Sequence, residues 1–98
     1  MEKIDNLALE MSQIFKMLSD KNRIRLLLLL QQEQELNVTS IAEKLELEQS
    51  AVSHQLKLLK ARHLIKGRRE GKSIFYTLDD DHVNYLLKIT QDHIQHSS

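Results

Sequence analysis

The sequence predicts a mainly α-helical fold that carries one β-hairpin. The 98 residues include no proline and only two glycines, and 41% of them are hydrophobic, which is typical of one compact helical domain. Apolar residues recur at helical spacing along most of the chain. Between residues 63 and 78 the pattern changes to short β-type runs on either side of the sequence REGK, and this change predicts the hairpin.

The first third of the chain predicts two helices. Residues 4–18 place apolar side chains at positions i, i+3, i+4 and i+7, so we expect an amphipathic helix that packs on its own core or on a second copy. Asp20 is a good N-cap for a second helix. That helix contains the run from Leu26 to Leu30 and is apolar on most sides, so we expect it to be central.

Two further helices follow the polar loop QQEQEL. The stretch NVTSIAEKL predicts a short helix, capped either by Asn37 or by Ser40 in a capping box with Glu43. After a break at residues 46–48, QSAVSHQLKLLKA predicts a fourth helix. Its inward face is expected to carry Val52, Leu56 and Leu59, and its outer face Ser50, Ser53, His54 and Lys57.

A hairpin and a last helix complete the predicted fold. Residues 63–69 and 73–78 form the two strands, with Ile74, Tyr76 and Leu78 on one face, and Gly71 can adopt a positive φ in the turn. The last helix is expected over residues 80–96. Because no repeat, linker or low-complexity segment interrupts the chain, we expect a single domain over residues 1–98, whose N- and C-terminal helices dimerise.

The charge distribution points to a nucleic-acid partner for one face. The net charge is zero, but residues 57–72 contain seven basic residues and one acid, Glu70. Two helices joined by a short turn and followed by a basic hairpin form a winged helix-turn-helix, whose second helix enters the major groove. The alternative is an ordinary solvated surface. The candidate contacts to DNA bases and phosphates are Gln49, Ser50, Ser53, His54, Lys57, Lys60, Arg68, Arg69 and Lys72.

Four possible metal ligands lie on or beside the last helix, namely Asp80, His82, His93 and His96. His82 and His93 point the same way, since eleven residues make about three turns, but they lie roughly 16 Å apart along the helix. One chain therefore cannot close a site, whereas two antiparallel helices can bring the first pair of ligands in one chain to the second pair in the other. This geometry predicts a homodimer with two metal ions. The alternative is a solvated helix end.

Composition and the absence of certain motifs narrow the kinds of metal site, cellular location and activity that the sequence predicts. Without cysteine there is no disulfide or thiolate site, and imidazole with carboxylate suits zinc, cobalt or nickel. There is no run of eighteen apolar residues and no apolar signal core, so we expect a cytoplasmic protein with no membrane partner. Four protein ligands leave no open metal position, and there is no nucleophile-base pair or phosphate-binding glycine loop, so we expect no enzyme.

The segments LSDKNRIRLLLLL and SIAEKLELEQSAVSHQLKLLKARHLIKGRREGKSIFYTL resemble the ArsR/SmtB winged-helix repressors over nearly the whole chain. The spacing of Asp80, His82, His93 and His96 looks like the C-terminal helix site of the zinc- and cobalt-sensing members. The resemblance implies a homodimer that represses metal-efflux genes and releases its operator DNA when Zn(II), or Co(II), binds between the two C-terminal helices. Because each subunit of such a dimer carries one recognition helix, we expect the operator to be an inverted repeat. The resemblance also implies that His93 contacts the backbone around His63 and so links the metal to the DNA-binding core.

The chain departs from the family pattern at two places. Asn37 and Thr39 stand where many relatives carry the cysteines of a thiolate site, so that site is absent, and Glu48 replaces a serine that often caps the recognition helix.

Two alternative functions fit the same residues. One is a winged-helix repressor that answers to a non-metal signal, and the other is a histidine-based metal buffer or small hydrolase, which predicts no salt-dependent affinity for DNA.

Overall fold

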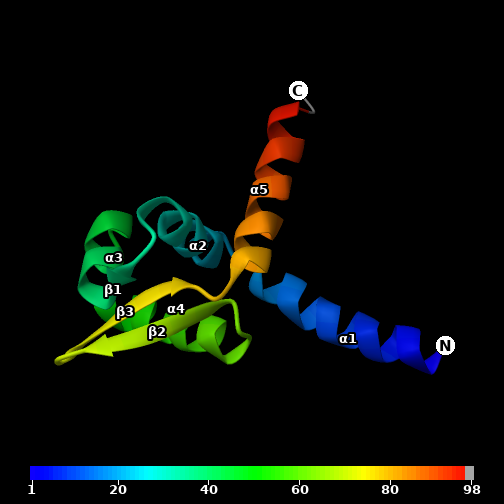
Figure 1. The fold of residues 1–98 in the computed structure, drawn as a ribbon, viewed down its shortest axis with the longest axis horizontal. Coiled ribbons are helices and arrows are strands. Elements are labelled where there is room, and N and C mark those ends of the chain that lie inside the picture. The colour runs from blue at the N-terminus through cyan, green and yellow to red at the C-terminus, as the bar shows by residue number, and fades with distance from the viewer. Residues whose placement is uncertain (97–98) are drawn as a thin grey trace.

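The structure is a computed structural model that describes residues 1–96, and it confirms the mainly α fold with a hairpin wing (Figure 1). Its helices are α1 (Glu2–Met17), α2 (Lys21–Glu33), α3 (Val38–Leu45), α4 (Gln49–Ala61) and α5 (Asp81–His96). Its strands are β1 (Leu36–Asn37), β2 (Ile65–Glu70) and β3 (Ser73–Leu78). No helix among residues 1–96 combines the length and the apolar character that a membrane crossing requires.

The core lies between the helix-turn-helix and the inner face of the wing. The second helix is central as predicted, because Leu26, Leu27 and Leu30 of α2 are all buried. The predicted inward positions of α4 are also buried, and they pack in one cluster with α3 and with the beginning of β2. The buried core residues are Leu26, Leu27, Leu30, Ile41, Ala42, Leu45, Val52, Leu56, Leu59, Leu64, Ile65, Val83 and Leu87.

Side-chain caps mark the starts of α2 and α3. The Asp20 carboxylate accepts a hydrogen bond from the Arg23 amide at 3.0 Å, which confirms its predicted cap of α2. For α3, the Asn37 side chain accepts from the Ser40 amide at 2.9 Å, so the first of the two predicted caps is the one formed. Glu48 makes no side-chain cap of α4. Helix α4, the predicted recognition helix, therefore begins without a side-chain cap.

Replacing Asn37 with alanine is expected to lower the free energy of unfolding by about 1 kcal/mol, the typical loss when an N-cap amide is truncated. Chemical denaturation with an unchanged m-value measures this difference. Ser40→Ala is the matched control and should change stability by only a few tenths of a kcal/mol. An equal loss in both variants would mean that the cap is shared with the Ser40 hydroxyl.

The wing is a three-stranded antiparallel sheet in the order β1-β3-β2. The prediction of two strands was therefore incomplete, because β1 has only two residues and is too short to show a sequence period. The register pairs Ile65 with Leu78 at the base and Glu70 with Ser73 beside the turn. Gly71 has φ +63°, as the turn prediction required. An added Cβ at Gly67 would lie 2.8 Å from Ile74 Cγ2, so only glycine fits there without a shift.

Helices α1 and α5 project from this body as two arms (Figure 1). None of the residues of α1 is buried, and α5 buries only Val83 and Leu87. The radius of gyration is 14.6 Å, above the value of about 13 Å expected for a compact domain of this size. Large apolar side chains stay exposed on both arms: Ile4, Leu7, Leu9, Met11 and Phe15 on α1, and Tyr85, Ile89 and Ile94 on α5.

Candidate DNA-binding surface and metal ligands

The outer face of α4 is polar and exposed along its length. Val52, Leu56 and Leu59 turn toward the core, and this orientation leaves the opposite side of the helix to solvent. The structure therefore presents every α4 residue predicted to contact DNA on one accessible helix, namely Gln49, Ser50, Ser53, His54, Lys57 and Lys60. Hydroxyl, amide, imidazole and ammonium groups on one helix face are suited to base edges and phosphates.

A polar groove of about 280 Å³ lies between the helix-turn-helix and the wing. Ser53 of α4 lines one part of it, and Lys72 at the wing turn lines another. The remaining lining residues come from β1, the start of α3 and β3. The structure thus brings a predicted base contact and a predicted phosphate contact to the same surface.

Arg68 of β2 does not carry a free positive charge. Its Nε and Nη2 atoms donate to the two Glu35 carboxylate oxygens at 3.1 and 2.6 Å, and its Nη1 donates to Glu70 at 2.7 Å. The guanidinium also lies 5.3 Å from the centre of the Phe75 ring. The hydrogen bond from Arg68 lowers the pKa of Glu35, and both carboxylates raise the pKa of Arg68. Counting charges along residues 57–72 missed this cluster, since Glu35 lies 33 residues away.

The metal-ligand candidates form two groups at opposite ends of α5. Asp80 and His82 lie together, with His82 Nδ1 3.4 Å from Asp80 Oδ2. His93 and His96 lie in the last turn, and both are exposed. Among residues 1–96 no three histidine or acidic side chains lie close enough to hold one ion. The donor set suits zinc, but a single chain places only half of it at either end.

The Asp80 carboxylate also holds the start of α5. Its Oδ1 accepts from the His82 amide at 2.8 Å and from the Val83 amide at 3.3 Å. The pKa of Asp80 is lowered, first by the His82 side chain and then by these backbone donors, so this carboxyl ionises readily. The oxygen nearest the His82 ring is Oδ2, which is not used by the cap, and one carboxylate can therefore cap the helix and bind a cation.

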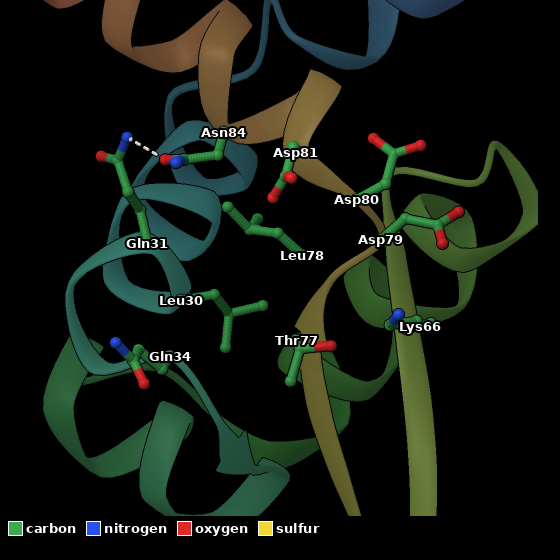
Figure 2. Close-up of a pocket in the computed structure, with 10 residues that line it drawn as sticks. All are labelled: Leu30, Gln31, Gln34, Lys66, Thr77, Leu78, Asp79, Asp80, Asp81 and Asn84. Atoms are coloured by element: carbon green, nitrogen blue, oxygen red, sulfur yellow. Dashed lines mark hydrogen bonds between the residues drawn. The ribbon is translucent and has the colours of Figure 1, made fainter.

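One polar contact holds the start of α5 to the DNA-binding core, and a second holds the segment just before α5. Figure 2 shows Gln31 of α2 and Asn84 of α5 pointing toward each other, and Gln31 Nε2 donates to Asn84 Oδ1 at 2.8 Å. The Asp79 amide donates to the Leu64 carbonyl at 3.1 Å, which joins the end of the wing to its base. Gln31, Asp79 and Asn84 border an open pocket of about 400 Å³. A displacement of the start of α5 would therefore disturb these two hydrogen bonds and, through them, the positions of α2 and the wing.

His63 occupies the tight turn between α4 and β2. It has φ +58°, in the left-handed region, and its amide donates to the Lys60 carbonyl at 3.0 Å. Within residues 1–96 of one chain, no hydrogen bond joins His93 to this turn. A link between the two, as the family resemblance implies, is thus a prediction for the assembled protein.

The helix-turn-helix, the exposed polar face of α4 and the three-stranded wing define a winged helix-turn-helix DNA-binding protein. Residues 20–66 match the family model described as bacterial regulatory protein, arsR family. The chain is 41% identical over 90 residues to the transcriptional repressor SmtB homolog of Synechocystis, an alignment that covers 92% of this chain and 67% of that protein. The chain belongs to the ArsR family of bacterial regulatory proteins, which are transcriptional regulators and not enzymes.

Two other similar proteins add detail. The cadmium resistance regulatory protein CadC homolog of Staphylococcus aureus is 39% identical over 82% of this chain and 66% of its own length. The chain thus spans about two thirds of the length of both relatives. A homodimeric winged helix-turn-helix domain from Mycobacterium bovis superposes with a TM-score of 0.86 at 27% identity, over 93% of this chain and 83% of that one.

Proposed function

We propose that this protein is a metal-responsive repressor whose metal-free homodimer binds operator DNA and releases it when Zn(II), or Co(II), binds between the two α5 helices. Release would derepress metal-efflux genes. The observation that carries the proposal is the division of four suitable donors between the two ends of one exposed helix. The start of α5 is hydrogen-bonded to α2, and the segment before it is hydrogen-bonded to the base of the wing. An ion that shifts α5 would therefore also shift the DNA-binding elements.

The proposed metal site needs two chains. Asp80 and His82 of one chain, with His93 and His96 of the other, make a four-donor set of imidazole and carboxylate, repeated twice in a symmetric dimer. When bound, the ion supplies a fixed positive charge that cross-links the two α5 helices. Apolar side chains exposed along α1 and α5 provide the surface for such a dimer. The homodimeric domain from Mycobacterium bovis, which shares this fold, is consistent with that assembly.

The proposed DNA-binding surface combines α4 with the wing. Gln49, Ser50, Ser53 and His54 would read bases, and Lys57 and Lys60 would contact the phosphate backbone; all six are exposed on α4. Arg69 and Lys72 of the wing supply further phosphate contacts. A symmetric dimer then favours an inverted repeat with half-sites about one helical turn apart.

Zinc affinity is expected to fall as the pH drops below about 6.5, the ordinary range for imidazole protonation, because a ligating histidine must be neutral. Asp80 should not contribute to this fall. Its pKa is lowered, so the carboxylate stays ionised until the pH falls below the ordinary carboxyl range. Competition titrations with a chromophoric chelator between pH 8 and pH 5.5 measure the effect. A constant affinity over that range would exclude histidine ligation.

The proposal is tested with an inverted repeat selected from randomised DNA by the metal-free dimer. Affinity for this DNA is measured at fixed salt with chelator and with saturating zinc. We expect zinc to weaken binding about 5- to 150-fold, and the DNA to weaken zinc binding by the same factor, because coupling is reciprocal. Zinc binding that leaves DNA affinity unchanged would instead indicate a metal buffer or a repressor of non-metal signals.

A further inference from the structure

We infer that Arg68 positions the wing and does not contact DNA phosphate. Its guanidinium holds the outer face of the hairpin to the segment before β1, and Arg69 and Lys72 are left as the wing's contacts to DNA. The inference rests on the proposed DNA-binding function. It reassigns one residue that the charge pattern groups with the other basic side chains of the wing.

The hydrogen bonds of Arg68 form a strap across the sheet. Strand β3 lies between β1 and β2, so a side chain on β2 must cross β3 to reach Glu35, which immediately precedes β1. Arg68 does so over the ring of Phe75, its cross-strand partner. At the far side it meets both Glu35 oxygens in a two-pronged contact, and Glu70 takes its third donor. Such fork-shaped pairing fixes orientation as well as distance.

Strand alternation places this strap on the face of the sheet that is turned away from the recognition helix. Successive side chains on a strand point to opposite faces. Ile65 of β2 is buried, and its cross-strand partner Leu78 packs against the core, so these residues mark the inner face. Arg68 is an odd number of positions from Ile65 and points outward, whereas Arg69 is an even number away and shares the inner side with Ile74. A phosphate contacted by the α4 side of the wing is therefore met by Arg69.

The wing needs such a contact because it has little core of its own. Within β2 only Ile65 is buried, and residues 66–70 are all exposed. Strand β1 pairs with β3 at only two positions. The strap adds a tie between β2 and the rest of the sheet at the level of Phe75, halfway along the hairpin. Exposed ion pairs add little to global stability. We therefore expect the strap to order the wing locally and to fix its orientation, with little effect on the free energy of unfolding.

Glu35→Gln distinguishes the two roles of Arg68 by the sign of its effect on DNA affinity. If Arg68 positions the wing, losing the Glu35 charge loosens the strap and weakens DNA binding, roughly two- to fivefold per subunit. If Arg68 contacts phosphate and Glu35 competes with it, the same change frees the guanidinium and strengthens binding. Strengthened or unchanged binding would overturn the inference.

Arg68→Met and the matched control Arg69→Met supply a second readout, the dependence of affinity on salt. Each phosphate contact adds about one to the slope of log affinity against log salt concentration. Arg69→Met should therefore lower the slope by about one per subunit. Arg68→Met should weaken binding by the same factor at every salt concentration and leave the slope unchanged. A slope reduced as much as in Arg69→Met would show that Arg68 contacts DNA.

Amide hydrogen exchange in the DNA-free dimer separates this inference from the proposed function. Glu35→Gln and Arg68→Met should speed exchange in the β2 and β3 amides, and Arg69→Met should not. Unchanged exchange in the first two variants would overturn the strap. If the wild-type protein showed no salt-dependent DNA binding, the proposed function would fail, while exchange would still decide whether Arg68 orders the wing.

Discussion

A Leu7→Asp variant is expected to be monomeric and to lose roughly 100-fold or more of its operator affinity. Leu7 is 54% exposed on α1 and lies on the stripe that includes Ile4 and Met11, so in a single chain this stripe faces solvent. A carboxylate there leaves the core of the chain intact but buries a charge in the proposed interface. Losing the dimer removes the gain from engaging two half-sites at once, which is typically 10²- to 10⁴-fold.

Leu9→Asp is the matched control. Leu9 is 59% exposed on the same helix but lies about 200° around it from Leu7. The Leu9→Asp substitution should therefore perturb the dimer far less than Leu7→Asp, because it places its charge outside the proposed interface. Light scattering gives the mass of each variant, and fluorescence anisotropy gives its affinity for the selected inverted repeat. A dimeric Leu7→Asp protein with wild-type affinity would remove α1 from the interface.

A His93→Asn variant is expected to lose zinc-induced release of DNA while keeping its affinity for the operator without metal. His93 is proposed both as a ligand and as the residue whose second ring nitrogen links the metal to the turn at His63. Without this link the operator affinity should change little at saturating zinc, against the 5- to 150-fold change expected of the wild type.

His96→Asn is the comparison variant for this prediction. His96 lies one turn further along, at the end of α5, and is proposed as a ligand alone. It should bind zinc more weakly but still release DNA once zinc is saturating. Operator affinity with and without zinc is measured at fixed salt beside a direct metal titration. Full release by metal-saturated His93→Asn would remove His93 from the relay, though not from the ligand set.

Local signals in the sequence were sufficient for most of the fold. The N-cap at Asp20, the inward face of α4 and the positive φ at Gly71 each depend on residues within one or two turns of the chain. Strand β1 could not be predicted, since its formation depends on pairing with β3, some 40 residues further along. The apolar side chains of α5 fall into two groups: Val83 and Leu87 pack on the chain's own core, whereas Tyr85, Ile89 and Ile94 are exposed.

The candidate site was predictable where it depends on composition and spacing, and unpredictable where it depends on contacts between distant segments. Periodicity predicted the exposed residues of α4 and the position of the candidate metal ligands near the two ends of α5. It could not show that Arg68 is paired with Glu35, because a run of basic residues reveals nothing about a carboxylate brought in by another element. The Gln31–Asn84 hydrogen bond likewise joins residues 53 positions apart.

Zinc stoichiometry of a mixed dimer tests most directly the claim that the metal site is shared between chains. One chain carries Asp80→Asn with His82→Asn, where asparagine can still cap α5, and the other carries His93→Asn with His96→Asn. A shared site predicts no tight zinc in either parent homodimer and one zinc in the purified mixed dimer, because one of its two sites then has all four ligands. A mixed dimer that binds no zinc, or a parent homodimer that binds two, would contradict the account.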